Sequence, residues 1–239
     1  MIERGRAAGL RRLLVPGYDL PSSEAAIALA ARHPDLIDAA VGIHPHYAGS
    51  LAAADWARLE ALAAEPGVVA IGELGLDFYR NLAPREAQVG ALERQLDLAA
   101  RIGLPVIVHD RDAHADISRT LLAWRGPGRE PKGILHCFSG DASMALRLNA
   151  AGFLVSFALP LTFSSAAGPR AAAAALPDGG FLVETDAPWL APGGGQARNE
   201  PTTALRVAAE LARLRGTTPE AISASVARAY ARLVGRQVA

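Results

Sequence analysis

The chain has 239 residues, of which 51% are hydrophobic and 20% charged, so a disordered chain is excluded and a buried core is expected. Its 24 basic and 24 acidic residues cancel, and a neutral chain does not hold nucleic acid through bulk charge. Its one cysteine, Cys137, excludes an internal disulfide and argues against a zinc–thiolate cluster. No apolar run has the length of a membrane span or the flanks of a signal peptide, so we expect a cytoplasmic protein.

Short β-branched runs alternate with longer stretches rich in alanine and leucine along nearly the whole chain. Residues 2–9 predict part of a helix, and residues 55–65 and 84–102 predict two more, which end at Pro66-Gly67 and at Gly103. The β-branched runs are almost continuously apolar, as parallel strands buried on both faces are. Seven strands are expected, at residues 13–15, 37–43, 68–73, 105–109, 133–137, 153–157 and 181–186.

Repeated strand–helix units predict an α/β fold with right-handed crossovers. No linker or low-complexity segment divides the chain, so residues 1–239 are interpreted as a single domain. A TIM-type (β/α)8 barrel needs eight strands, and an open doubly wound sheet of seven strands is the alternative. The polar residues at the strand ends decide between them.

Four expected strands end in residue types that bind metals: Glu73, His109, His136 and Asp186. Residues two apart on a strand share a face, so each of these side chains points the same way as an apolar residue before it. Cys137 has the opposite parity to His136 and is not expected to be a ligand. Ligands from four separate strands converge only where the strand ends form a ring, which favours the barrel.

Two histidines and two carboxylates suit zinc, manganese or magnesium. Such a metal lowers the pKa of a bound water and stabilises charge on an attacked oxygen, which is the chemistry of hydrolysis. A single buried histidine or carboxylate is more often a satisfied core group. Four at matching positions favour a metal site, because unpaired buried carboxylates are costly.

Six short motifs carry a family resemblance: residues 42–46 (GIHPH), 72–77 (GELGLD), 109–112 (HDRD), 136–140 (HCFSG), 184–188 (ETDAP) and 198–201 (RNEP). In this order they resemble the TatD family of metal-dependent deoxyribonucleases. The resemblance implies a (βα)8 barrel that binds two divalent cations and cleaves phosphodiester bonds in DNA.

The resemblance also assigns roles. Glu73 is the carboxylate associated with both metals, and His109 and His136 are ligands of one of them. Asp186 is a ligand of the other metal and the base for its water, so Glu73 and Asp186 are the catalytic candidates. The expected cofactors are Mg, Mn or Zn ions, up to two, with the second site weakened. The expected partner is DNA, single-stranded or with free ends, with no membrane and no obligate protein partner.

The substrate-binding candidates are His44, His46, Arg111 and Arg198, which are expected to contact a phosphate or, for the histidines, the attacking water. For the two histidines the alternative is a turn held by Pro45. For Arg111 the alternative is an ion pair with Glu184.

Other polar residues near these positions are given lesser roles. Asn199, next to Arg198, is interpreted as a possible helix cap. Asp77, Asp112 and His114 are placed in loops at the barrel mouth, behind the residues that contact the metal.

The family's usual first strand, which ends in a His-x-His pair, has no match here, so the first barrel strand is expected to be missing. Either the true start lies roughly twenty residues upstream, from the length of a strand plus half a helix, or the chain is a truncated, weakly active product. The intact ligands favour the first. Two rival functions stay open: hydrolysis of carboxylic or aminoacyl esters or amides on the same barrel, and a non-catalytic metal-binding remnant.

Overall fold

The computed structural model describes residues 1–192 and 198–236. The chain divides into two compact units. The first unit is Arg12–Leu135, and the second combines Met1–Arg11 with His136–Ala239.

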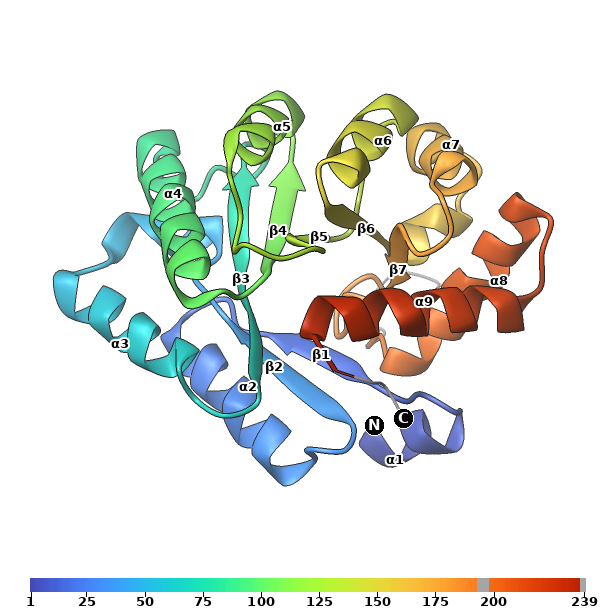
Figure 1. Ribbon diagram of the computed structural model, residues 1–239, viewed down its shortest axis with the longest axis horizontal. Coiled ribbons are helices and arrows are strands. Elements are labelled where there is room, and N and C mark those ends of the chain that lie inside the picture. Colours follow the sequence, from blue (N-terminus) through green and yellow to red (C-terminus); the bar gives the residue numbers. More distant parts are fainter. Residues whose placement is uncertain (193–197, 237–239) are drawn as a thin grey trace. The chain divides into compact units, whose positions relative to one another are not determined.

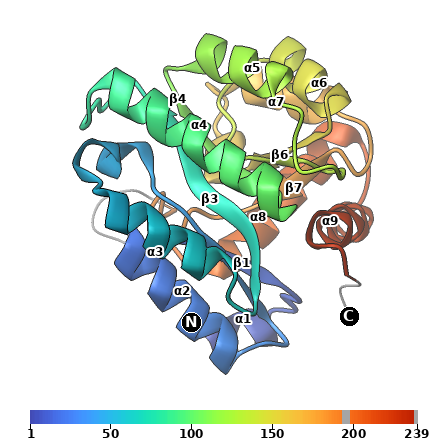
Figure 2. The same cartoon turned by 60° about the vertical axis from the view of Figure 1, so that its left-hand side comes forward.

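The first unit is a parallel sheet covered by helices (Figure 1). Its strands are β1 (Leu13–Pro16), β2 (Ile37–Val41), β3 (Val68–Asp77), β4 (Val106–Arg111) and β5 (Gly133–Leu135), each paired in parallel with the next. Its helices are α2 (Leu20–Arg32), α3 (Ala53–Ala63), α4 (Arg85–Ile102) and α5 (His114–Ala123), with a short 3₁₀ helix, η1 (Pro45–Ser50). Figure 2 shows α3 and α4 packed along the long strand β3.

Local sequence signals set the ends of these helices. Asp19 caps α2 by accepting the N–H of Ser22 at 2.8 Å, while the Ser22 hydroxyl accepts the N–H of Asp19. Helix α4 ends at Gly103, whose φ of 76° is a conformation that glycine adopts without steric cost. One face of α4 is buried in the protein: Leu92, Leu96 and Ala99 are at most 2% exposed.

The second unit carries two strands, β6 (Phe153–Phe157) and β7 (Phe181–Val183), which pair in parallel. Three phenylalanines at the ends of these strands, Phe153, Phe157 and Phe181, are the largest fully buried side chains of its core. The helices around them are α1 (Ile2–Ala7), α6 (Ala142–Ala150), α7 (Ala167–Ala175), α8 (Ala204–Arg215) and α9 (Pro219–Val234), with the 3₁₀ helices η2 (Leu159–Thr162) and η3 (Pro201–Thr203).

The predicted α/β class is confirmed, because seven strands alternate with helices in the described part of the chain. Most strand ends differ from the prediction. Strand β4 continues to Arg111, whereas β5 stops at Leu135 and β7 at Val183, so His136 and Asp186 follow their strands instead of ending them. Strand β2 ends at Val41 rather than at residue 43, and β3 continues to Asp77 instead of stopping at Glu73. The ladder between β3 and β4 resumes at Leu74 after a register shift, so Glu73 lies inside its strand. No helix within residues 1–192 and 198–236 is long and apolar enough to cross a membrane.

Candidate active site

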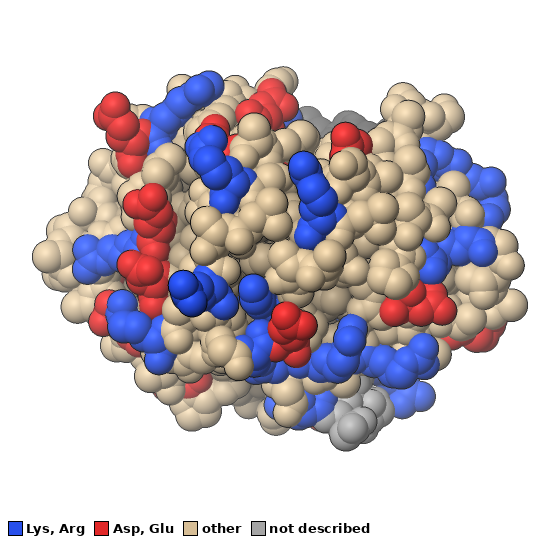
Figure 3. Space-filling view, turned by 45° about the horizontal axis from the view of Figure 1, so that its top comes forward, with Lys and Arg blue, Asp and Glu red and all other residues tan. Residues whose placement is uncertain are grey.

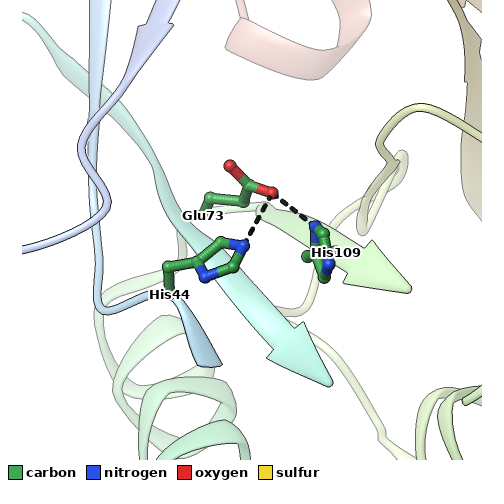
Figure 4. A group of neighbouring side chains, drawn as sticks. All are labelled: His44, Glu73 and His109. Atoms are coloured by element: carbon green, nitrogen blue, oxygen red, sulfur yellow. Dashed lines mark hydrogen bonds and ion pairs between the residues drawn. The ribbon is translucent and has the colours of Figure 1, made fainter. Parts of the chain in front are cut away.

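A cluster of polar side chains in the first unit brings together Glu73, His109 and His44 (Figure 4). One Glu73 oxygen, Oε1, lies 2.8 Å from His109 Nδ1 and 3.6 Å from His44 Nε2. All three donor atoms lie within 4.8 Å of one another. The structure therefore joins two of the predicted metal ligands with a residue predicted to contact substrate.

Gly75, two residues after Glu73, allows strands β3 and β4 to approach closely at this cluster. Gly75 has a φ of 144°, and a Cβ built there would lie 2.0 Å from the carbonyl oxygen of His109. Any other residue at position 75 would push the two strands apart. The spacing between Glu73 and His109 thus depends on this glycine.

His44 is neutral and has a defined hydrogen-bonding direction. Burial lowers the pKa of His44 to about 3, although the nearby Glu73 carboxylate opposes this effect. Its Nδ1 accepts the backbone N–H of His46 at 3.1 Å, so the proton of the neutral ring is on Nε2. A nitrogen that carries a proton donates a hydrogen bond instead of binding a metal. This supports the predicted substrate contact over a ligand role for His44.

Asp77 is the centre of a second part of the cluster. Its side chain is 1% exposed, and its Oδ2 lies 2.7 Å from His46 Nε2 and 3.4 Å from His109 Nε2. Burial alone would raise the pKa of Asp77, but hydrogen bonds from His109, the Arg80 backbone and His46 hold it below its usual range. The expectation of Asp77 in a loop is wrong, because it ends strand β3 and orients both histidines.

Two buried glutamines of α4 fix the backbone on which the cluster stands. Gln95 accepts the N–H of Ile43 at 2.8 Å and donates to the carbonyl oxygen of Ile43 at 3.0 Å, just before His44. Gln88 accepts the N–H of Asp77 at 2.8 Å. Neither glutamine was singled out from the sequence. Their positions on the buried stripe of an amphipathic helix are the signal that would have found them.

The second unit holds the other two predicted ligands side by side. His136 Nε2 lies 3.6 Å from Asp186 Oδ1, and His136 Nδ1 lies 2.9 Å from Glu184 Oε2. The other Glu184 oxygen accepts the backbone N–H of Cys137 at 2.6 Å. Glu184 therefore holds the ring of His136 so that its far nitrogen faces Asp186.

The RNEP motif is placed differently from the sequence interpretation. Asn199 does not cap a helix; it is fully buried and donates to the carbonyl oxygens of Thr185 at 2.6 Å and Leu190 at 3.3 Å. These hydrogen bonds fix the position of the loop that carries Asp186. Arg198 is exposed, and Glu200, on the other side of Asn199, pairs with Arg4 of α1 at 2.5 Å.

Arg111 lies at the end of β4 with its guanidinium 4.0 Å from the centre of the Tyr79 ring. The Glu184 carboxylate is engaged by His136 and Cys137. The Arg111 guanidinium therefore contacts Tyr79, and the Glu184 carboxylate positions His136.

The donor atoms fit a divalent cation in spacing and in chemistry. Two ligand atoms of one zinc ion, each about 2.0–2.2 Å from it, lie roughly 3 Å apart. The nitrogen–oxygen distances are close to this value, at 2.8 Å between His109 and Glu73 and 3.6 Å between His136 and Asp186. Each histidine turns its other nitrogen toward a further carboxylate, Asp77 or Glu184. Carboxylates in this position fix the ring and its tautomer in metal sites.

Comparisons with known proteins agree with this geometry. The model of the TatD-related DNase family matches residues 1–235. The uncharacterized metal-dependent hydrolase YabD of Bacillus subtilis is 37% identical over 224 residues, covering 93% of this chain and 87% of YabD. A protein of Cronobacter sakazakii named 3′-5′ ssDNA/RNA exonuclease TatD is 38% identical over 239 residues, covering 98% of this chain and 90% of its own.

Solved structures give the same result. The crystal structure of YjjV, a TatD homologue from Escherichia coli K12, has a TM-score of 0.90 and 30% identity, covering 98% of this chain and 90% of YjjV. An uncharacterized amidohydrolase from Saccharomyces cerevisiae has the same fold, with a TM-score of 0.81 at 17% identity. These likenesses confirm the TIM-barrel type of the α/β fold. The chain belongs to the TatD-related DNase family of metal-dependent hydrolases.

Proposed function

We propose that this protein hydrolyses phosphodiester bonds in single-stranded nucleic acid with the help of divalent metal ions. The observation that carries the proposal is the pairing of a carboxylate with a histidine in each unit, Glu73 with His109 and His136 with Asp186. Several relatives at 35–41% identity are named 3′-5′ ssDNA/RNA exonucleases, which supports a nucleic-acid substrate attacked from its 3′ end.

In each unit the carboxylate and the histidine would help to hold a divalent ion, which supplies a water of lowered pKa and neutralises charge on the phosphate. Asp186 would accept the proton of the attacking water at its carboxylate. His44 would donate its Nε2 proton to a phosphate oxygen, since burial keeps the ring neutral and Nδ1 is occupied. Asp77 and Glu184 would keep His109 and His136 in the orientation that ligation needs.

Three further residues would contact the substrate without binding metal: His46, Arg111 and Arg198. His46 is held by Asp77 at 2.7 Å and stands next to His44, with ring centres 4.2 Å apart. Arg111 and Arg198 are both exposed cations that suit a phosphate.

The test is hydrolysis of a labelled single-stranded oligonucleotide in Mg²⁺, Mn²⁺ or Zn²⁺, set beside aryl and aminoacyl ester substrates. We expect shortening of the strand from its 3′ end and loss of activity in Glu73→Ala and His136→Ala, with lower metal content. Turnover of esters but not of DNA or RNA would favour the ester hydrolase. One tightly held ion with no turnover of any substrate would favour a binding protein.

A further inference from the structure

Three tyrosines of the first unit expose a large part of their side chains. Tyr18, Tyr47 and Tyr79 are 47%, 44% and 61% exposed. Each follows the C-terminal end of a different strand: Tyr18 follows β1, Tyr47 lies in η1 after β2, and Tyr79 follows β3. All three therefore belong to the edge of the sheet that carries the Glu73 cluster.

Neighbouring side chains hold these rings in defined orientations. Tyr18 and Tyr47 stack on each other, with ring centres 5.8 Å apart and planes inclined by 23°. The Tyr79 ring lies under the Arg111 guanidinium at 4.0 Å. A ring held on one face and exposed to this degree presents its other face as a flat, preorganised surface.

Backbone contacts connect both stacks to the candidate active site. The carbonyl oxygen of Tyr18 accepts the N–H of His44, and the N–H of Tyr47 donates to the carbonyl oxygen of His44, each at 2.9 Å. On the other side, Arg111 is the register partner of Asp77, and Tyr79 follows Asp77 closely in the chain. The stacks are thus placed beside His44 and Asp77, within a few residues of the groups that would meet a phosphate.

Flat aromatic and guanidinium surfaces next to a phosphate site suit one class of ligand, the unpaired base. Bases of single strands stack on aromatic rings and on arginine, with little dependence on their identity. Bulk charge does not supply the affinity, since the chain is neutral and its basic and acidic side chains lie interspersed on the face shown in Figure 3. Stacking would supply it locally.

We propose that the Tyr18–Tyr47 stack and the Tyr79–Arg111 stack bind unpaired bases of a single-stranded nucleic acid whose backbone lies at the Glu73 cluster. The proposal rests on the function proposed above and deepens it, because it assigns recognition of the strand to base stacking. Paired bases present no free face, so it also accounts for selection of single strands over duplexes.

The test measures binding without hydrolysis. A fluorescein-labelled hexanucleotide with phosphorothioate linkages is compared with the same strand carrying abasic sites, by fluorescence anisotropy. Wild-type protein is expected to bind the complete strand more tightly. Tyr47→Leu and Tyr79→Leu should each raise the Kd for the complete strand about tenfold and leave the Kd for the abasic strand unchanged.

Two controls separate stacking from structural effects. Tyr47→Phe and Tyr79→Phe keep the ring and should bind like wild type. Leu122→Ala removes an equally exposed apolar side chain in the last turn of α5 and should have no effect. The proposal would be overturned if the leucine variants lost affinity for both strands equally or lost none. It would also be overturned if wild-type protein bound the complete and the abasic strand with the same Kd.

The outcome for binding is independent of the outcome for hydrolysis. If wild-type protein hydrolyses DNA while the leucine variants bind the complete strand as tightly as wild type, base stacking is wrong and the phosphodiesterase proposal stands. If the leucine variants behave as expected but wild-type protein hydrolyses no strand, the catalytic proposal is wrong and the base-binding surfaces stand.

Discussion

Gln95 of α4 holds both backbone groups of Ile43, accepting from its N–H at 2.8 Å and donating to its carbonyl oxygen at 3.0 Å. Ile43 lies after the end of β2, and the next residue is His44. The side-chain amide takes the place of a strand partner at this point. A helix on the outside of the sheet thereby sets the position of a residue in the active site.

Replacing Gln95 with leucine should weaken both the fold and the reaction. Two buried backbone groups would lose their partners, so we expect the free energy of unfolding to fall by about 2–4 kcal/mol, measured by urea denaturation. The kcat for oligonucleotide hydrolysis should fall with it, because His44 loses its support. Gln95→Glu keeps an acceptor for the N–H but sets a buried carboxylate against the carbonyl oxygens of Ile43 and Ala91, so at neutral pH it should destabilise the protein at least as much as leucine does. A leucine variant as stable and as active as wild type would contradict the role of Gln95.

Replacing Gly75 tests whether β3 and β4 need a glycine to lie this close together. Gly75→Ala places a Cβ against the His109 carbonyl at a φ of 144°, so the free energy of unfolding should fall by about 3 kcal/mol or more. Gly90→Ala is the matched control, because an added Cβ there meets nothing within 4 Å. In the middle of α4 the same change should stabilise the protein by about 0.8 kcal/mol. Equal effects of the two substitutions would argue against a steric role for Gly75.

Glu184 is predicted to act through His136. Glu184→Gln leaves one carbonyl oxygen to serve both the His136 ring and the Cys137 N–H, so the ring loses its fixed orientation. We expect metal affinity to fall about 10- to 100-fold, measured by competition with a chelator. The substitution is isosteric, so thermal unfolding without metal should change little. Unaltered metal affinity in Glu184→Gln would show that His136 does not depend on this contact.

The sequence predicted which side chains lie together better than it predicted the residues that support them. Apolar runs that end in a polar residue can be recognised in the sequence, because the run and the polar residue are consecutive along the chain. The four such residues are Glu73, His109, His136 and Asp186. The structure then places Glu73 against His109 and His136 against Asp186. Whether these pairs bind metal stays a prediction that the experiments above test.

The supporting residues were missed for identifiable reasons. The predicted strand stopped at Glu73, whereas β3 continues through Gly75 to Asp77, so Asp77 was assigned to a loop. Gln88 and Gln95 belong to the buried side of α4, but their partners are backbone groups of distant segments. Only the folded chain shows which carbonyl and N–H groups lack a strand partner.

Stability at low pH should depend on Glu210 of α8. Hydrogen bonds from Arg213 and Arg170 lower the pKa of its carboxyl to about 2, although burial opposes them. In the unfolded chain this carboxyl takes up its proton near its ordinary pKa of 4.5. The free energy of unfolding should therefore fall as the pH drops from about 4.5 toward 2.

Glu210→Gln removes this titration. The difference in unfolding free energy between wild type and the variant, followed by denaturation from pH 7 to pH 3, should be largest at neutral pH and should shrink below pH 4.5. A difference that stays constant over this range would show that the Arg213 and Arg170 contacts do not favour the charged form.

Glu73 is the residue on which the proposed metal-dependent hydrolysis of nucleic acid depends. The direct measurement compares wild type, Glu73→Gln and the exposed control Glu60→Gln in shortening a 5′-labelled single strand in Mn²⁺, with bound metal determined by mass spectrometry. We expect Glu60→Gln to match wild type, whereas Glu73→Gln should lose at least about hundredfold in rate and retain less metal. A folded Glu73→Gln protein that hydrolyses the strand at the wild-type rate would contradict this dependence.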